Sequence, residues 1–294
     1  MASRTPPLLE PYLRLPHETS LILLSGVLGS STNWLLHRYL YSLLASQSSS
    51  PQSLNHQDEP TESTGAELQH QRTSVVFVSF LRDYAFWKDG SKRLGLDLDV
   101  ASKRGAFVFV DGLSGLFTQS SDAGRRQPVA DSSGRRVLLA ATADHLRRAL
   151  EDAVAHAQAL NPETQVVLVI DQPDVLLATG GDTMSGQGLR STILGLRERV
   201  HSCITTISAD EPLIVAQGTS LEKEHSSLAL SLAHDAQLIM SLRILETGTA
   251  KDVSGVLRVT PGGDEETSST PIEDRELLYF IRGDGSVHVF ERGQ

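Results

Sequence analysis

The sequence predicts an α/β protein with a mainly parallel sheet, helices on both faces of the sheet, and an antiparallel β-rich edge at the C-terminal end. Short, continuous apolar runs alternate with amphipathic segments over the front two thirds of the chain, which is typical of buried parallel strands and covering helices. The last third holds strand-like runs separated by short turns. No internal repeat and no strong domain boundary interrupts the 294 residues, so we expect a single domain over 1–294.

The expected strands share uninterrupted apolar or β-branched side chains bounded by polar turns. In chain order they cover residues 21–24, 75–80, 107–110, 166–170, 213–216, 238–245, 255–259, 277–281 and 287–290. The last two flank Gly283-Asp284-Gly285, and an Asp-Gly turn between such runs is a strong hairpin signal.

Helical periodicity predicts the elements that lie between the strands. The expected helices cover residues 34–44, 85–94, 142–160 and about 189–203. Thr142 is the expected N-cap of the third helix, and Asn161-Pro162 stops it. Residues 178–188 and 217–226 are expected to be loops. The polar, Ser- and Gln-rich segment 46–72 cannot bury enough apolar surface to offset its ordering entropy, so we expect a disordered insertion there.

Composition excludes several classes of protein. The net charge is −10, so nucleic acid could be bound only through a local basic patch or through basic partner subunits. The single cysteine, Cys203, excludes intramolecular disulfides and cysteine zinc clusters. We see no secretory signal and no apolar stretch of the roughly 18 residues that a membrane span needs, and the ten histidines show no metal-ligand spacing. We therefore expect an intracellular protein without membrane contact and without a metal site.

The strand at 21–24, a small-residue turn and the helix at 34–44 have the order of a phosphate-binding loop. Such a loop needs Gly, four residues, Gly, Lys and then Ser or Thr. Counted from Gly26, the chain has Ser31 in place of the second Gly, Thr32 in place of Lys and Asn33 in place of the metal-binding hydroxyl. The candidate residues Gly26, Gly29, Ser30, Ser31 and Thr32 therefore form a degenerate phosphate loop without its chemistry. A plain strand-to-helix turn capped by Ser31 or Thr32 is the alternative.

Two carboxylates end predicted strands. Asp171 follows the strand at 166–170 and occupies the position that holds Mg²⁺ in P-loop proteins, or else it caps the following loop. Asp111 follows the strand at 107–110 and is a weaker candidate for polarising a water molecule. Because the lysine is missing, we expect no catalytic residue in this chain.

The order of these elements resembles the RecA-type ATPase core. Two blocks, SFLRDYAFWKDGSKRLGLDLD at 79–99 and FVFVDGLSGLF at 107–117, resemble the sixth subunit of the Elongator complex. The resemblance implies a RecA-like fold with a degenerate P-loop. It also implies a heterohexameric ring with two sister RecA-like subunits, subunits four and five, that binds tRNA and serves the catalytic subcomplex modifying wobble uridine (U34). We accordingly expect a cytoplasmic and nuclear protein.

The resemblance implies that the loops after the Asp-terminated strand and after the next strand face the central pore of the ring. Here these are the loops expected at 178–188 and 217–226. Arg190 and Lys223 lie in or near them and could contact tRNA phosphates. We expect no resident cofactor, and at most a weakly bound nucleotide between neighbouring subunits. Two alternatives stay open: a catalytically active RecA-like ATPase of DNA repair or signalling, and a generic interaction module.

Overall fold

The computed structural model describes residues 5–45, 72–117, 135–245, 250–263 and 272–292. The insertion expected at 46–72 lies outside the described residues except for Arg72, so it stays a prediction. Within the described residues, no helix is both long and apolar enough to cross a membrane.

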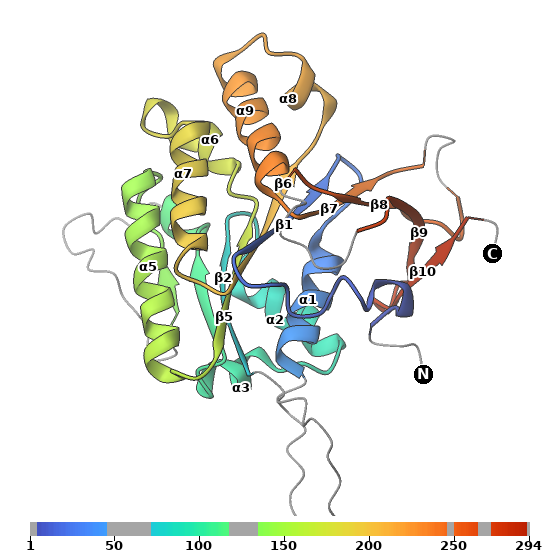
Figure 1. The fold of residues 1–294 in the computed structure, drawn as a ribbon, viewed down its shortest axis with the longest axis horizontal. Helices are drawn as coiled ribbons and strands as arrows, with labels where there is room; N and C mark the ends of the chain where they lie inside the picture. The colour runs from blue at the N-terminus through green and yellow to red at the C-terminus, as the bar shows by residue number, and fades with distance from the viewer. Residues whose placement is uncertain (1–4, 46–71, 118–134, 246–249, 264–271, 293–294) are drawn as a thin grey trace, which may run out of the picture.

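One ten-stranded sheet runs through the molecule (Figure 1). The strands are β1 (Ser20–Gly26), β2 (Thr73–Ser79), β3 (Phe107–Asp111), β4 (Arg136–Val137), β5 (Gln165–Asp171), β6 (Ser202–Ser208), β7 (Leu238–Arg243), β8 (Gly255–Pro261), β9 (Arg275–Ile281) and β10 (Val287–Glu291). Their spatial order is β10-β9-β8-β7-β1-β6-β5-β2-β3-β4.

The helices connect and cover these strands. They are η1 (Pro7–Leu9), α1 (Asn33–Ala45), α2 (Tyr84–Arg93), α3 (Leu98–Lys103), α4 (Ser114–Phe117), α5 (Ala143–Leu160), α6 (Val175–Thr179), η3 (Gly181–Thr183), α7 (Gly186–Arg197), α8 (Glu211–Val215) and α9 (Ser220–Asp235).

Parallel pairing joins all strands from β7 to β4, whereas β7 to β10 pair antiparallel in sequence order. The predicted fold class, a mainly parallel sheet with an antiparallel C-terminal edge, is therefore confirmed. Strand β6 lies between β1 and β5. The chain therefore forms β2 to β5 away from β1, and β6 then fills the place directly beside β1.

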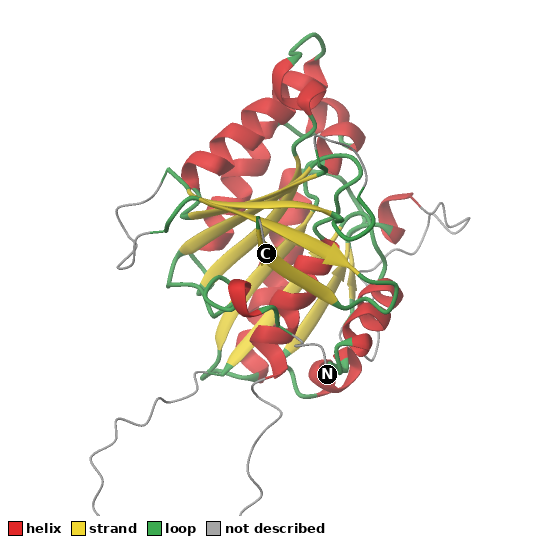
Figure 2. Cartoon of the chain, turned by 90° about the vertical axis from the view of Figure 1, so that its right-hand side faces the viewer, coloured by secondary structure: helices red, strands yellow, loops and turns green. Residues whose placement is uncertain are grey.

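Alternate residues along the strands contribute to two separate hydrophobic cores, one on each face of the sheet. On β1, Ile22 and Leu24 pack with α1, α2 and α3, while Leu21 and Leu23 pack with α5, α7 and α9. This alternation follows from the two-residue period of a strand. Figure 2 looks at the sheet from the side of β9 and β10 and shows helices on both sides of the strands.

Two predictions in the region from 202 to 235 were wrong. Residues 213–216, predicted as a strand, lie in α8 and just after it. The parallel strand that follows β5 is β6, which begins at Ser202, where the predicted helix 189–203 ran too far. Of the loop predicted at 217–226, residues from Ser220 onward belong to α9. Polar residues explain why β6 was missed: Thr205 and Thr206 make it look unlike a buried strand, although both are fully buried.

Candidate functional site

The loop between β1 and α1 is closed by the protein's own hydrogen-bonding groups. The backbone N–H of Leu28 donates to the Asp210 carboxylate at 2.6 Å. The N–H of Val27 is directed to the Leu242 carbonyl at 3.2 Å and to the Ser30 hydroxyl at 3.1 Å. One backbone N–H of this loop, of the kind that phosphate loops use to bind anions, therefore already has a carboxylate of this chain as its partner.

The residues that replace the phosphate-binding consensus are placed differently from a working loop. Thr32, at the lysine position, is only 4% exposed, so it points into the protein. The Ser31 hydroxyl accepts the N–H of Asn33 at 3.2 Å and so serves the start of α1. Gly29 has a φ of +90°, a left-handed conformation that glycine adopts readily. This geometry is that of a strand-to-helix turn built on the outline of a phosphate loop.

Asp171 lies at the same edge of the sheet and is fully buried. Its two carboxylate oxygens accept hydrogen bonds from the hydroxyls of Ser79 on β2, at 2.7 Å, and Thr206 on β6, at 2.9 Å. Burial raises the pKa of Asp171 to about 6, while the two hydroxyls act in the opposite direction. A carboxylate with both oxygens engaged and no exposed surface does not face a bound nucleotide in this conformation.

The sheet register separates the loop from this carboxylate. Gly26 is level with Ser208, and Ile170 is level with Thr205 on the same strand β6. Asp171 therefore lies two strands away from β1, roughly 10 Å across the sheet. Along the strand direction it lies about two residues, or roughly 7 Å, before the level of Gly26. The structure brings the two predicted features to one edge but does not join them through a shared hydrogen bond.

Asp111 has a local structural role. Its carboxylate accepts the N–H groups of Leu113 at 2.9 Å and Ser114 at 2.7 Å, which places it at the start of α4. Strand β3 is also four strands from β1, or roughly 19 Å across the sheet. Asp111 thus caps a turn, the role that had been considered as the alternative for Asp171.

The two predicted basic contacts are far apart. Arg190 on α7 makes a bidentate ion pair with Asp235, at 2.6 and 2.8 Å, near the C-terminal end of α9. Lys223 is exposed in the first turns of α9, twelve residues earlier, or about 18 Å along the helix. The surrounding segments do meet, because Glu224 accepts the N–H of Gly186 at 2.6 Å.

Sequence reasoning missed Asp210 and Thr206, which complete the loop and the Asp171 cluster. A signal for the first was present: Asp210 stands before a helix that carries Pro212 at its first positions, a common helix start. Thr219 and Glu222 form a capping box, which is likewise a sequence signal for the start of α9. No comparable signal marks Thr206, whose partner becomes visible only once the sheet order is known.

These features define the class of protein. The chain has a strand-loop-helix unit at β1 and α1, and an antiparallel edge formed by its last strands. Strand β6 lies in the sheet between β1 and the Asp-terminated β5. Together these features are those of a RecA-like α/β protein. Its fold is similar to the crystal structure of a KaiC-like protein from Pyrococcus horikoshii OT3, with a TM-score of 0.56, 15% identity, and coverage of 98% of this chain and 97% of that one.

The chain belongs to the Elongation complex protein 6 family, whose model matches residues 68–282. Elongator complex protein 6 of Xenopus laevis is 27% identical over 230 residues, which cover 71% of this chain and 80% of the relative. The homolog of Schizosaccharomyces pombe is 24% identical over 292 residues, 97% of each chain. The human protein is 25% identical over 230 residues. The resemblance to the sixth Elongator subunit is thereby confirmed.

Proposed function

We propose that this chain is a non-catalytic, RecA-like subunit of the Elongator complex. In this proposal it assembles with two sister subunits into a heterohexameric ring that binds tRNA and supports U34 modification by the catalytic subcomplex. The observation that carries the non-catalytic part is the hydrogen bond between the Leu28 N–H and the Asp210 carboxylate, in a loop that lacks the lysine. A loop that holds a carboxylate repels the triphosphate that an ATPase must bind.

In the presence of Mg²⁺, the purified chain is expected to hydrolyse ATP no faster than a protein-free buffer blank. A missing charge-assisted hydrogen bond alone costs about 1.5–3 kcal/mol, which is one to two orders of magnitude in rate. Phosphate release should be measured for the wild type and for Asp171→Asn. Brisk turnover that Asp171→Asn abolishes would overturn the proposal and favour the ATPase alternative.

Exposed apolar side chains beside the loop support assembly with a sister subunit. Leu28 is 85% exposed, and Ile244, next to Gly29, is 50% exposed. Val215 on α8 is exposed as well. Apolar side chains grouped at one edge are typical of an interface, and any weakly bound nucleotide would lie between the neighbours there.

The double variant Leu28→Asp/Ile244→Asp is expected to prevent ring assembly, because two carboxylates would have to be desolvated in the interface. Co-expression with the two sister subunits followed by size-exclusion chromatography measures it. Leu160→Asp is the matched control, since Leu160 is also 50% exposed but ends α5 at the opposite edge of the sheet. Intact rings with the double variant would show that the interface lies elsewhere.

For tRNA, we propose a weak, shape-based contact shared around the ring, with Arg190 and Lys223 as the contributions of this chain. Sharing is required because a chain with a net charge of −10 repels a polyanion. The two residues are not equivalent, since Asp235 already neutralises much of the Arg190 charge.

In the assembled ring, Lys223→Glu is expected to weaken tRNA binding severalfold and to lower the slope of log affinity against log salt by about 0.7–0.9 per lost phosphate contact. Arg190→Glu should have the smaller effect on the slope. Lys103→Glu, the same charge reversal at the amino edge of the sheet, serves as the control. A slope that is equal for Lys223→Glu and Lys103→Glu would remove Lys223 from the contact.

A further inference from the structure

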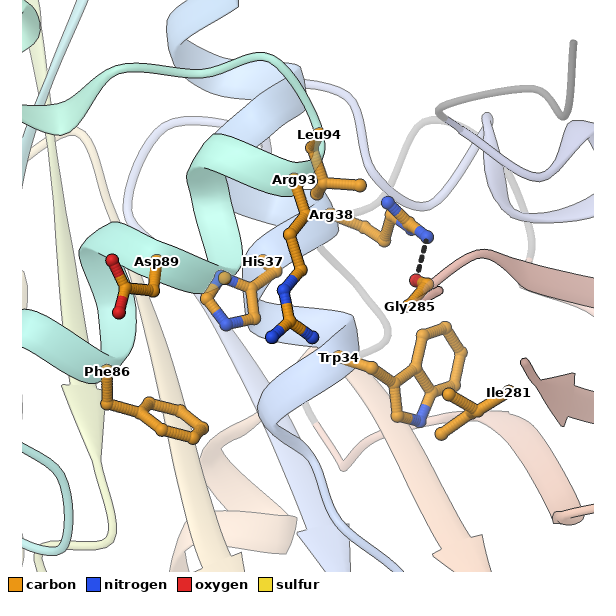
Figure 3. Close-up of a pocket in the computed structure, with 10 residues that line it drawn as sticks. Trp34, His37, Arg38, Phe86, Asp89, Arg93, Leu94, Ile281 and Gly285 are labelled. Atoms are coloured by element: carbon orange, nitrogen blue, oxygen red, sulfur yellow. Dashed lines mark hydrogen bonds between the residues drawn. The ribbon is translucent and has the colours of Figure 1, made fainter. Parts of the chain in front are cut away.

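A cavity of about 330 Å³ lies between α1, α2 and the turn that joins β9 to β10 (Figure 3). It opens on the face of the sheet that α1, α2 and α3 cover, and none of the predicted site residues lines it. Its volume is at the lower end of the range for small-ligand pockets. The function proposed above makes no use of it.

A buried cation with free donors lines this cavity. Arg38 is 2% exposed, and its Nη2 donates to the Gly285 carbonyl at 3.2 Å. Its Nε and Nη1 have no hydrogen-bond partner among the described residues. A guanidinium carries five N–H donors, and leaving them unpaired away from water is costly. An acceptor that entered the cavity would complete the arrangement.

Two further groups point to the same kind of acceptor. Arg93 from α2 extends between His37 and Trp34 in Figure 3, and no ion pair of Arg93 is found within the described residues. The indole N–H of Trp34, which is 8% exposed, is likewise unpaired there. Burial and the two arginines lower the pKa of His37 to about 4, so its ring is neutral at physiological pH.

Charge and shape narrow the chemistry of the ligand. Asp89, the acid in the lining, lies on the other side of His37 from Arg93 in Figure 3. Two arginines and one aspartate leave one net positive charge, which suits a monoanionic carboxylate better than a phosphate dianion. The remaining walls are apolar and aromatic and include Phe86 and Ile281.

We propose that the cavity between α1, α2 and the β9–β10 turn binds a carboxylate carried on an apolar body. Arg38 and Arg93 hold the carboxylate, Trp34 donates its indole N–H, and Phe86 packs against the apolar part. The carboxylate has two sources of the same chemistry: a free hydrophobic acid, or the C-terminal residue of a peptide chain.

The full chain should be titrated by calorimetry with 3-phenylpropanoate and with a short peptide ending in phenylalanine. Saturable binding of at least one is expected, with a shift of the His37 ring proton signals in NMR spectra. The tighter of the two probes identifies the source. The corresponding amides, which lack the negative charge, should bind at least tenfold more weakly.

Arg93→Gln should weaken carboxylate binding at least tenfold, because it removes a charge-assisted contact. Lys92→Gln is the matched control: it removes the same charge from the neighbouring, exposed position of α2 and should leave the affinity unchanged. Arg93 is itself exposed, so folding should survive the change. Absence of saturable binding, equal binding of acid and amide, or equal effects of the two variants would overturn the proposal.

Discussion

Asp171→Asn is expected to make the protein more stable at pH 8, by up to about 3 kcal/mol. Burial raises the pKa of Asp171 from 3.8 to about 6, so the folded state holds a proton that the unfolded chain releases between these values. The favourable contribution is complete below pH 3.8 and is lost as the pH rises through about 6. At about 1.4 kcal/mol per pKa unit, the ionised carboxylate is a substantial burden at pH 8. Asparagine keeps the shape without the charge.

Urea denaturation of the wild type and the variant at pH 5 and pH 8 measures this effect. The stability difference should widen from pH 5 to pH 8, since only the wild type ionises at this position. Asp111→Asn is the control, because its side chain accepts backbone N–H groups that an asparagine oxygen also satisfies. A variant that is less stable at pH 8 would contradict the prediction, because the hydroxyl hydrogen bonds that only a carboxylate accepts at both oxygens would then outweigh the cost of burying its charge.

Trp87→Ala is expected to cost about 3–5 kcal/mol of unfolding free energy, the usual cost of deleting a buried aromatic side chain. Trp87 is fully buried, with its ring centroid 4.6 Å from that of Phe77 and 4.9 Å from that of His37. Its indole N–H has no partner within the described residues, so Trp87→Phe should cost much less than Trp87→Ala. Thermal or urea unfolding at neutral pH gives both values.

Phe86→Ala is the matched control for this prediction. Phe86 is the adjacent aromatic residue on α2 and is 37% exposed, so its truncation should cost about 1 kcal/mol. If the two alanine variants were equally stable, Trp87 would not be a core anchor. The structure separates these two neighbouring aromatic residues: Trp87 lies in the core and Phe86 lines a cavity.

Most of the fold was predictable because most strands are apolar throughout. Val75, Val167 and their neighbours on β2 and β5 are buried from both sides, so their hydrophobic runs identify them without knowledge of the partners. Strand β6 could not be recognised in the same way. Its Thr206 is buried with hydrogen-bond partners in Asp171, the last residue of β5, and in the N–H of Gln172, which follows β5.

The candidate site was predictable in position and less so in its contacts. The spacing after Gly26 shows which consensus residues are missing, and Asp171 does end a strand at the same edge. The contact between Leu28 and Asp210 joins residues 182 positions apart, so no local pattern encodes it. Because residues 213–216 were predicted as a strand, the helix that starts after Asp210 was not recognised. Long-range polar contacts of this kind require the sheet order first.

The closed loop also determines how many changes ATP chemistry would require in this chain. Thr32→Lys alone would place an ammonium at a position that is 4% exposed, in a loop whose Leu28 N–H is already bonded to the Asp210 carboxylate. A hydroxyl at position 33 would leave the hydrogen bond between Asp210 and the Leu28 N–H unchanged. ATP chemistry in this loop would therefore need several simultaneous substitutions, none of which confers activity by itself.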